Sequence, residues 1–142
     1  MTASPDTRRS GCPINYALEI FGDRWTLLVL RDLLLVGRRH YKELLAADEG
    51  IASNILSDRL KRLEDRGLIS KRRDPADGRQ LLYGPTEAAI DLLPMLIEMT
   101  AWGARNDPQT AAPPDFVRRF EEDREGLIAT YVAQARAMLD HS

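Results

Sequence analysis

The feature that most constrains the fold is a pair of short amphipathic segments followed by a hairpin. Residues 41–46 and 51–67 have helical patterns, and a tight turn at residues 48–50 joins them. Residues 68–83 then form two short β-like runs around a Pro/Gly turn at 74–78. This order predicts a winged helix-turn-helix, because one helix of that fold fits a DNA major groove while the hairpin reaches the flanking backbone.

The second amphipathic segment is the candidate recognition helix. At 100° per residue, Ala52, Leu56, Leu60 and Leu63 fall on one face and are expected to be buried. The polar residues of the segment are the candidate DNA contacts: Ser53, Asn54, Ser57, Asp58, Lys61 and Arg62. Asn pairs well with adenine, Ser bonds a base or a phosphate, and Lys and Arg suit phosphates. The alternative is an ordinary solvated helix face.

Asp58 is the exception on this face, because its carboxylate would repel phosphate. We expect it to accept a hydrogen bond from a cytosine amino group or to pair with Arg62.

Charge is distributed unevenly along the chain. The whole chain has a formal net charge of −2, which alone argues weakly against nucleic acid. Residues 59–79, however, hold eight basic side chains against four acidic ones, a local +4. A bound DNA interacts mainly with the local positive charge, because charges beyond about 10 Å are largely screened at physiological salt. The candidate wing contacts, which could also be a merely charged hairpin, are Lys71, Arg72, Arg73 and Arg79.

The N-terminal part predicts two helices. Pro13 suits the first position of a helix that ends at Gly22, with Cys12 at its N-cap and Ile14, Ala17, Leu18 and Phe21 on one face. Asp23 can cap the next helix, which spans residues 25–36 and is apolar nearly all round. Such a helix is expected to form the core of the domain.

The C-terminal part predicts two further helices. Thr86 caps one that reaches about Ala104 and that Pro94 should kink or break. A proline-rich linker follows at 106–114, and then one long helix from Asp115 to about Leu139. The expected fold class is α+β, mainly α: a winged helix-turn-helix domain at 1–107, then a linker and helical extension at 108–142. The N-terminal helix and the helices after Thr86 are expected to form a dimer surface.

Composition excludes several classes of protein. The chain has one cysteine and two histidines, so an intrachain disulfide is excluded and a structural zinc site is not expected. No cofactor and no metal are predicted.

Neither a signal peptide nor an 18-residue apolar run is seen, so no membrane contact is expected. The expected location is the cytoplasm, at the bacterial nucleoid when the protein is bound to DNA. Motifs of hydrolases, phosphate-binding loops and metalloproteases are absent, so an enzyme is not predicted. The one catalytic arrangement that remains open is a nucleophile pair of Cys12 with His40.

Cys12 has two interpretations. A lone cysteine is most often a small buried apolar residue. A helix N-terminus, by contrast, favours a thiolate, which reacts with electrophiles and oxidants. With no second cysteine in the chain, only an adduct or an intersubunit disulfide could follow.

The sequence resembles the HxlR family of winged helix-turn-helix transcriptional regulators over roughly residues 12–103. The resemblance is carried by Cys12-Pro13, Gly22, Trp25-Thr26, Gly37, Leu44, Gly50-Ile51, Arg59-Leu60, Leu63-Glu64, Gly67-Leu68-Ile69, Tyr83, Thr86 and Trp102-Gly103. Where the family usually has Arg-Phe this chain has His40-Tyr41, its Leu-Thr is here Pro85-Thr86, and an expected glycine is Ala89. The first is a mild change that keeps an aromatic core residue, and the other two affect the start of the helix after Thr86, not the fold.

The resemblance implies a homodimeric regulator that binds double-stranded DNA at a pseudo-palindromic operator. It also implies a response to electrophiles or oxidants through Cys12. Two alternatives stay open: a MarR-like repressor that answers to a small-molecule effector without a thiol switch, and a winged-helix protein-interaction module that does not bind DNA.

Overall fold

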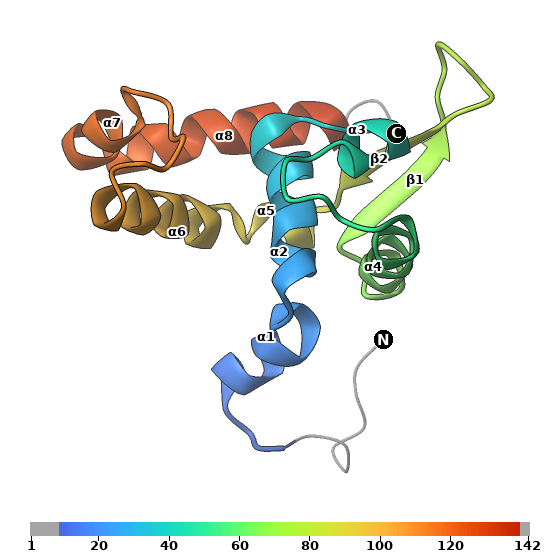
Figure 1. Cartoon of the computed structure of the whole chain (residues 1–142), viewed down its shortest axis with the longest axis horizontal. Helices are drawn as coiled ribbons and strands as arrows, with labels where there is room; N and C mark the ends of the chain where they lie inside the picture. The colour runs from blue at the N-terminus through green and yellow to red at the C-terminus, as the bar shows by residue number, and fades with distance from the viewer. Residues whose placement is uncertain (1–8, 140–142) are drawn as a thin grey trace.

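The computed structural model describes residues 9–139, which form a mainly helical domain with one small antiparallel hairpin (Figure 1). The elements in chain order are α1 (Pro13–Phe21), α2 (Arg24–Arg31), the π-helical turn η2 (Asp32–Val36), α3 (Tyr41–Leu45), α4 (Ser53–Asp65), β1 (Ile69–Arg73), β2 (Leu81–Pro85), α5 (Glu87–Ile90), α6 (Leu93–Asn106), α7 (Phe116–Glu122) and α8 (Arg124–Leu139). This confirms the expected winged helix-turn-helix. In Figure 1, α4 and the hairpin lie on one side of α2, α6 and α7 lie on the other, and α1 projects from the end of α2.

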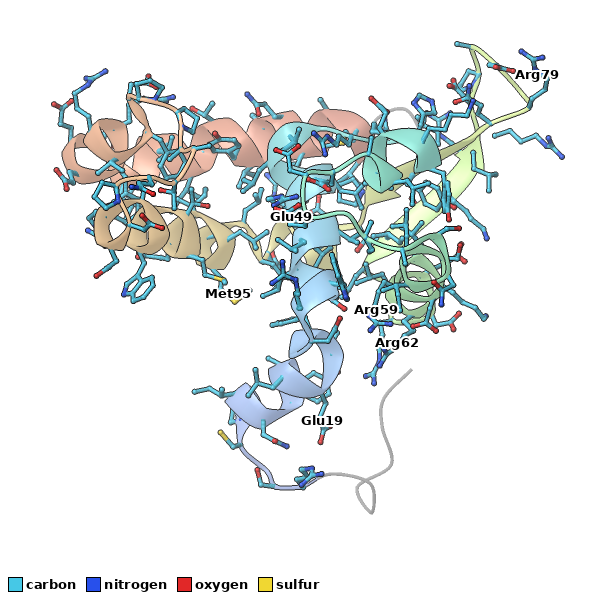
Figure 2. All side chains as sticks on the ribbon, in the orientation of Figure 1. Glu19, Glu49, Arg59, Arg62, Arg79 and Met95 are labelled. Atoms are coloured by element: carbon cyan, nitrogen blue, oxygen red, sulfur yellow. The ribbon has the colours of Figure 1, made fainter. Side chains whose placement is uncertain are left out.

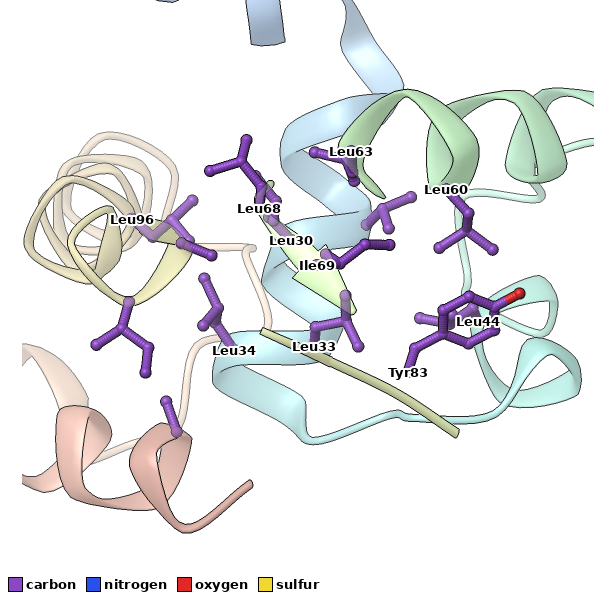
Figure 3. Packing of buried hydrophobic residues seen from close by; sticks show 14 of the residues in the cluster. Leu30, Leu33, Leu34, Leu44, Leu60, Leu63, Leu68, Ile69, Tyr83 and Leu96 are labelled. Atoms are coloured by element: carbon purple, nitrogen blue, oxygen red, sulfur yellow. The ribbon is translucent and has the colours of Figure 1, made fainter. Parts of the chain in front are cut away.

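The predicted core helix is the centre of the molecule, but it is not one regular helix. Leu30, Leu33 and Leu34 are almost fully buried and face α4, the hairpin and α6 (Figure 3). The α-helix gives way at Asp32 to a π-helical turn, which ends at Gly37 with φ of 83°. That left-handed conformation suits glycine and stops the helix.

The helix-turn-helix has the predicted boundaries within two residues. Gly50 adopts φ of 71° in the turn between α3 and α4, and Leu56, Leu60 and Leu63 are buried as expected. The prediction for Ala52 is wrong. Ala52 is the extended N-cap of α4 and is exposed, so the 100° step of a helix does not apply to it.

The hairpin is the wing, and its second strand begins later than predicted. β2 starts at Leu81 and not at Arg79, because the loop 74–80 is closed by its own hydrogen bonds. The backbone N–H of Gln80 donates to the carbonyl of Asp77 (3.0 Å), and the N–H of Asp74 donates to the carbonyl of Gln80 (2.9 Å). β1 and β2 pair antiparallel, with Lys71 opposite Tyr83.

The break predicted at Pro94 is confirmed. Thr86 caps α5, which ends at Ile90, and Pro94 lies in the first turn of α6. Pro94 lacks an N–H, but a helix that begins just before it loses no backbone hydrogen bond, because the N–H groups of the first turn have no partner within the helix.

The single long helix predicted from Asp115 is wrong, because α7 and α8 are separate helices. Asp123 between them has φ −154° and ψ 74°, and its carboxylate accepts the N–H of Gly126 (3.0 Å) at the start of α8. Phe116, Phe120 and Leu127 form a second buried cluster with two residues of α6. α8 also contacts α5, β2 and η2, so the extension packs on its own domain. Within residues 9–139 no helix is long and apolar enough to cross a membrane.

Candidate nucleic-acid interface

The outer face of α4 presents the polar side chains that the sequence singled out. Ser53, Asn54, Ser57, Asp58, Lys61 and Arg62 are all exposed, opposite the buried leucines. The side chain of Asn54 forms no hydrogen bond with any other described residue. Its amide is therefore available to an external partner.

The charged residues of this face are paired with one another by weak contacts. Lys61 Nζ lies 3.5 Å from an Asp65 carboxylate oxygen, and Arg62 Nη1 lies 3.7 Å from Asp58. Asp58 also contacts Arg59. Exposed pairs of this kind contribute at most about 1 kcal/mol. Lys61 and Arg62 can therefore exchange these partners for phosphates at little cost, while the charge of Asp58 is compensated within the helix.

Arg59 differs from the other basic residues of the 59–79 segment, because it points back into the domain. Its Nε donates to the Asp23 carboxylate (2.8 Å), which also accepts the N–H groups of Trp25 and Thr26 at the start of α2. Burial opposes ionisation of Asp23, but the hydrogen bonds from Arg59 and Thr26 outweigh it and lower its pKa to about 2. Arg59 therefore fixes α4 against α2 and is not expected to contact DNA.

Tyr41 holds the recognition helix in place. Its hydroxyl lies 3.0 Å from both the carbonyl and the hydroxyl of Ser53 and 3.1 Å from the hydroxyl of Ser57. These hydrogen bonds lower the pKa of the Tyr41 phenol. α3 is thereby tied to the first two turns of α4, and both serine hydroxyls keep a fixed orientation.

The four predicted wing residues lie on one hairpin, but only Arg72 lacks an internal partner. Lys71 pairs with Glu64 (3.3 Å), Arg73 donates to the carbonyl of Gly78 (2.7 Å), and Arg79 pairs with Asp77 (3.0 Å). The guanidinium of Arg72 forms no hydrogen bond or ion pair within residues 9–139. In Figure 2, Arg79 lies at the tip of the wing at the upper right, and Arg62 lies at α4 well below it.

Arg39 is a basic residue beside the wing that the sequence did not single out. Its Nε donates to the carbonyl of Tyr83 (2.8 Å), and its own carbonyl accepts the N–H of Tyr83 (2.8 Å). Burial and the neighbouring charge of Arg72 lower the pKa of Arg39. Two neighbouring guanidinium groups at the sheet make this end of the wing strongly cationic. No local pattern could reveal the pair, because the residues are 33 positions apart in sequence.

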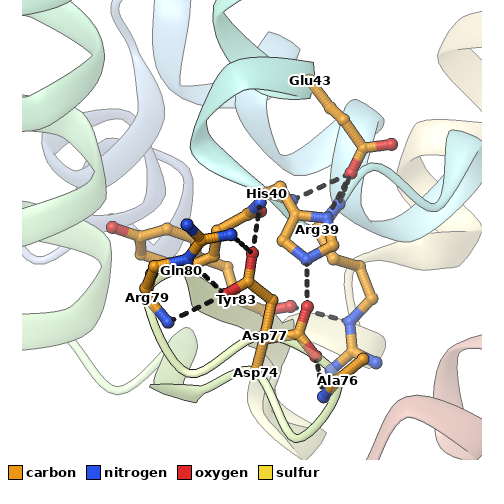
Figure 4. A network of polar contacts seen from close by, with 9 residues as sticks. All are labelled: Arg39, His40, Glu43, Asp74, Ala76, Asp77, Arg79, Gln80 and Tyr83. Carbon is orange, nitrogen blue, oxygen red and sulfur yellow. Dashed lines mark hydrogen bonds and ion pairs between the residues drawn. The ribbon is translucent and has the colours of Figure 1, made fainter.

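His40 connects the recognition unit to the wing (Figure 4). It is the N-cap of α3, where its Nδ1 lies 2.9 Å from the Glu43 carboxylate, and its Nε2 lies 2.7 Å from the Asp74 carboxylate at the base of the wing loop. Asp74, then Glu43, raise the pKa of His40. The loop 74–80 is thus held against the start of α3.

Cys12 is exposed, which contradicts the interpretation of a buried apolar residue. It is the N-cap of α1, as predicted, and Pro13 follows as the first helical residue. A shallow hollow around it is formed by Gly11, Pro13, Tyr16 and Glu19, among others. The thiol can therefore be reached by a reagent.

The pair of Cys12 with His40 that the sequence left open does not form, because both ring nitrogens of His40 face carboxylates of the wing network described above, Glu43 and Asp74. Among residues 9–139 no group of three or more His, Cys, Asp or Glu side chains is placed to hold a metal ion.

Comparison with known proteins gives a consistent result. The model of the family described as HxlR-like helix-turn-helix matches residues 20–111. An uncharacterized HTH-type transcriptional regulator of Mycobacterium tuberculosis, MT3179, is 36% identical over 130 residues, which cover 89% of this chain and 81% of that protein.

Solved structures agree with this. The crystal structure of PA1607 superimposes with a TM-score of 0.66 at 26% identity, over 76% of this chain and 75% of that one. The transcriptional regulator YodB from B. subtilis in its reduced form gives a TM-score of 0.55 at 28% identity, over 68% and 94% of the two chains. YodB has also been solved after diamide treatment.

Proposed function

The chain belongs to the HxlR-like helix-turn-helix family of transcriptional regulators, and we propose that it binds duplex DNA as a homodimer, without catalytic activity of its own. The observation that carries this proposal is the juxtaposition of the exposed polar face of α4 with the basic wing. α4 enters the major groove, where Asn54 and Ser57 contact base edges and Lys61 and Arg62 contact phosphates. Arg72 and its neighbours in the wing contact the flanking backbone.

Two unpartnered apolar surfaces support the homodimer. On α1, Ile14 is 71% exposed and Leu18 is 56% exposed; on α6, Met99 is 49% exposed and Trp102 is 65% exposed. Large exposed apolar side chains that gather on particular elements are typical of interaction surfaces. Packing of α1 and α6 against a second copy covers them, and the two-fold symmetry imposes a pseudo-palindromic operator with half-sites about 34 Å apart.

The exposed thiol of Cys12 at the start of α1 supports a redox or electrophile response. An electrophile adds to the Cys12 sulfur, or two subunits form a Cys12 disulfide while an oxidant takes up two electrons and two protons. Either product changes α1 at the proposed interface and alters the separation of the two recognition helices. YodB, which this chain resembles, has been solved in its reduced form and after treatment with diamide, a reagent that oxidises thiols.

The direct test is binding of the purified protein to the DNA upstream of its own gene, with salt varied. Each phosphate contact contributes about −0.9 to the log–log slope, so affinity should fall steeply as salt rises. Absence of any complex at low salt would refute DNA binding and favour a protein-interaction module. For Cys12, binding is compared before and after diamide or quinone treatment, in wild type and Cys12→Ser. An equal response of both proteins would remove Cys12 from the proposal.

A further inference from the structure

We propose that a cavity between η2, α6 and the segment before α7 binds a small amphipathic carboxylate, and that occupancy of this cavity changes the affinity for DNA. The second half of this inference rests on the proposed function. The cavity has a volume of about 760 Å³, within the range of small-molecule sites. Leu35, Met99, Phe116 and Tyr131 give it apolar walls, and Arg31, Asp32, Arg38 and Glu49 gather at its polar end.

The polar end contains two carboxylates, and one arginine forms hydrogen bonds with both of them. Arg31 Nε and Nη2 donate to Asp32 Oδ1 at 3.0 and 2.9 Å, and its Nη1 donates to Glu49 at 2.6 Å. Asp32 is only 3% exposed and lies in the π-helical turn, a feature often found at functional sites. Because Arg31 is paired with both Asp32 and Glu49, a cationic ligand would have to compete with it for either carboxylate.

Arg38 is the group with free binding capacity. Its guanidinium is about a third exposed, and its one ionic contact is a long one of 3.8 Å to Asp32 Oδ1. The guanidinium donates no hydrogen bond to any residue between 9 and 139. The charges of Arg31 and Arg38 balance those of Asp32 and Glu49; Asp48, which also lines the cavity, adds one negative charge and is exposed to solvent. A guanidinium with free donors beside apolar walls matches a carboxylate on an aromatic or aliphatic body.

The residues that follow Arg38 connect the cavity to the DNA-binding surface. Arg39 is hydrogen-bonded to Tyr83 of the wing, His40 to Asp74 of the wing loop, and Tyr41 to Ser53 and Ser57 of the recognition helix. Four consecutive residues therefore run from the cavity to both DNA-contacting elements. A ligand that draws Arg38 away from Asp32 acts on the segment that positions the wing and α4.

Binding is tested without DNA by calorimetry with 2-naphthoate, its neutral analogue 2-naphthamide and the cation 2-naphthylmethylammonium. We expect naphthoate to bind most tightly and Arg38→Gln to weaken it by about tenfold or more. Gly103→Leu should abolish binding, because a Cβ at Gly103 would meet no atom within 4 Å and the leucine would fill the cavity. Arg118→Gln, an exposed change on α7, is the control and should bind like wild type.

The coupling is tested by DNA titration with and without saturating naphthoate. We expect a change in affinity of about fivefold or more in wild type and none in Arg38→Gln. Preference for the cation, no binding of naphthoate, or binding that survives Gly103→Leu would overturn the site. Naphthoate binding with unaltered DNA affinity would overturn the coupling. Failure of wild type to bind any DNA would instead refute the proposed function, while the calorimetry would still decide the cavity.

Discussion

His40 Nε2 lies 2.7 Å from the Asp74 carboxylate, which joins the N-cap of α3 to the base of the wing loop across 34 positions of sequence. The other ring nitrogen, Nδ1, faces Glu43 at 2.9 Å. Both nitrogens can donate to carboxylates only in the protonated ring, so the charged form is the one that holds the wing. Asp77 adds a further negative charge nearby.

This arrangement predicts that His40 stabilises the fold more in mild acid than in base. Asp74 and Glu43 raise the pKa of His40, so its contribution is complete below the unfolded value of about 6.5 and is lost as pH rises through the folded pKa. The pKa of Asp74 is lowered, so the contribution fails again in strong acid. Urea unfolding of wild type and His40→Gln should differ more at about pH 6 than at about pH 9. A difference independent of pH would contradict this role.

Asp23 is predicted to be a stabilising cap that also holds α4. It accepts two N–H groups of α2 and the Arg59 guanidinium, so Asp23→Ala should lower the free energy of unfolding by about 1–2 kcal/mol. Asp115→Ala is the matched control, because Asp115 is also an N-cap but its side chain makes no cap hydrogen bond. That change should cost less than about 0.5 kcal/mol. Equal losses, measured by denaturant unfolding, would argue against the cap.

The C-terminal extension is predicted to support the domain that it covers. Leu127 is 1% exposed and packs with Ile97, Phe116 and Phe120, so Leu127→Ala should cost about 2–5 kcal/mol. Leu81→Ala is the control, since Leu81 in the wing is 42% exposed and should cost about 0.5 kcal/mol or less. If both variants unfold at the same urea concentration, α8 does not contribute to the core.

The proposed dimer surface is tested at Leu18, which is exposed on α1. Leu18→Glu places a charge in an apolar interface and should raise the dimer dissociation constant by about tenfold or more. Leu81→Glu, on the wing, should leave it unchanged. Sedimentation equilibrium measures both. A wild-type monomer, or a Leu18→Glu dimer as tight as wild type, would remove α1 from the interface.

The sequence predicted the elements whose signals are local. The spacing of Leu56, Leu60 and Leu63, the turn at Gly50 and the break before Pro94 are all visible within one or two turns of chain, and each was confirmed. Hydrophobic periodicity and Pro/Gly chemistry act over that range, which is why these elements could be predicted.

Most of what the sequence missed depends on contacts between distant residues. The division between α7 and α8 is different, because it follows from a local side-chain cap: Asp123 accepts the N–H of Gly126, and no proline marks the break. The inward direction of Arg59 is set by Asp23, and the role of His40 by Asp74. Charge counting treated Arg59 as part of the basic patch because a sequence does not show which way a guanidinium points.

The central claim is that α4 recognises base sequence while the wing binds the DNA backbone. The most direct measurement is fluorescence anisotropy of a panel of duplexes at several salt concentrations, with wild type, Asn54→Ala and Arg72→Ala, and with Arg118→Ala as control. Arg72→Ala should weaken binding to all duplexes alike and reduce the salt slope by about 0.9. Asn54→Ala should instead reduce the difference in binding free energy between preferred and other duplexes by about 1–3 kcal/mol. Variants that bind every duplex as wild type does, with the same salt slope, would contradict the account.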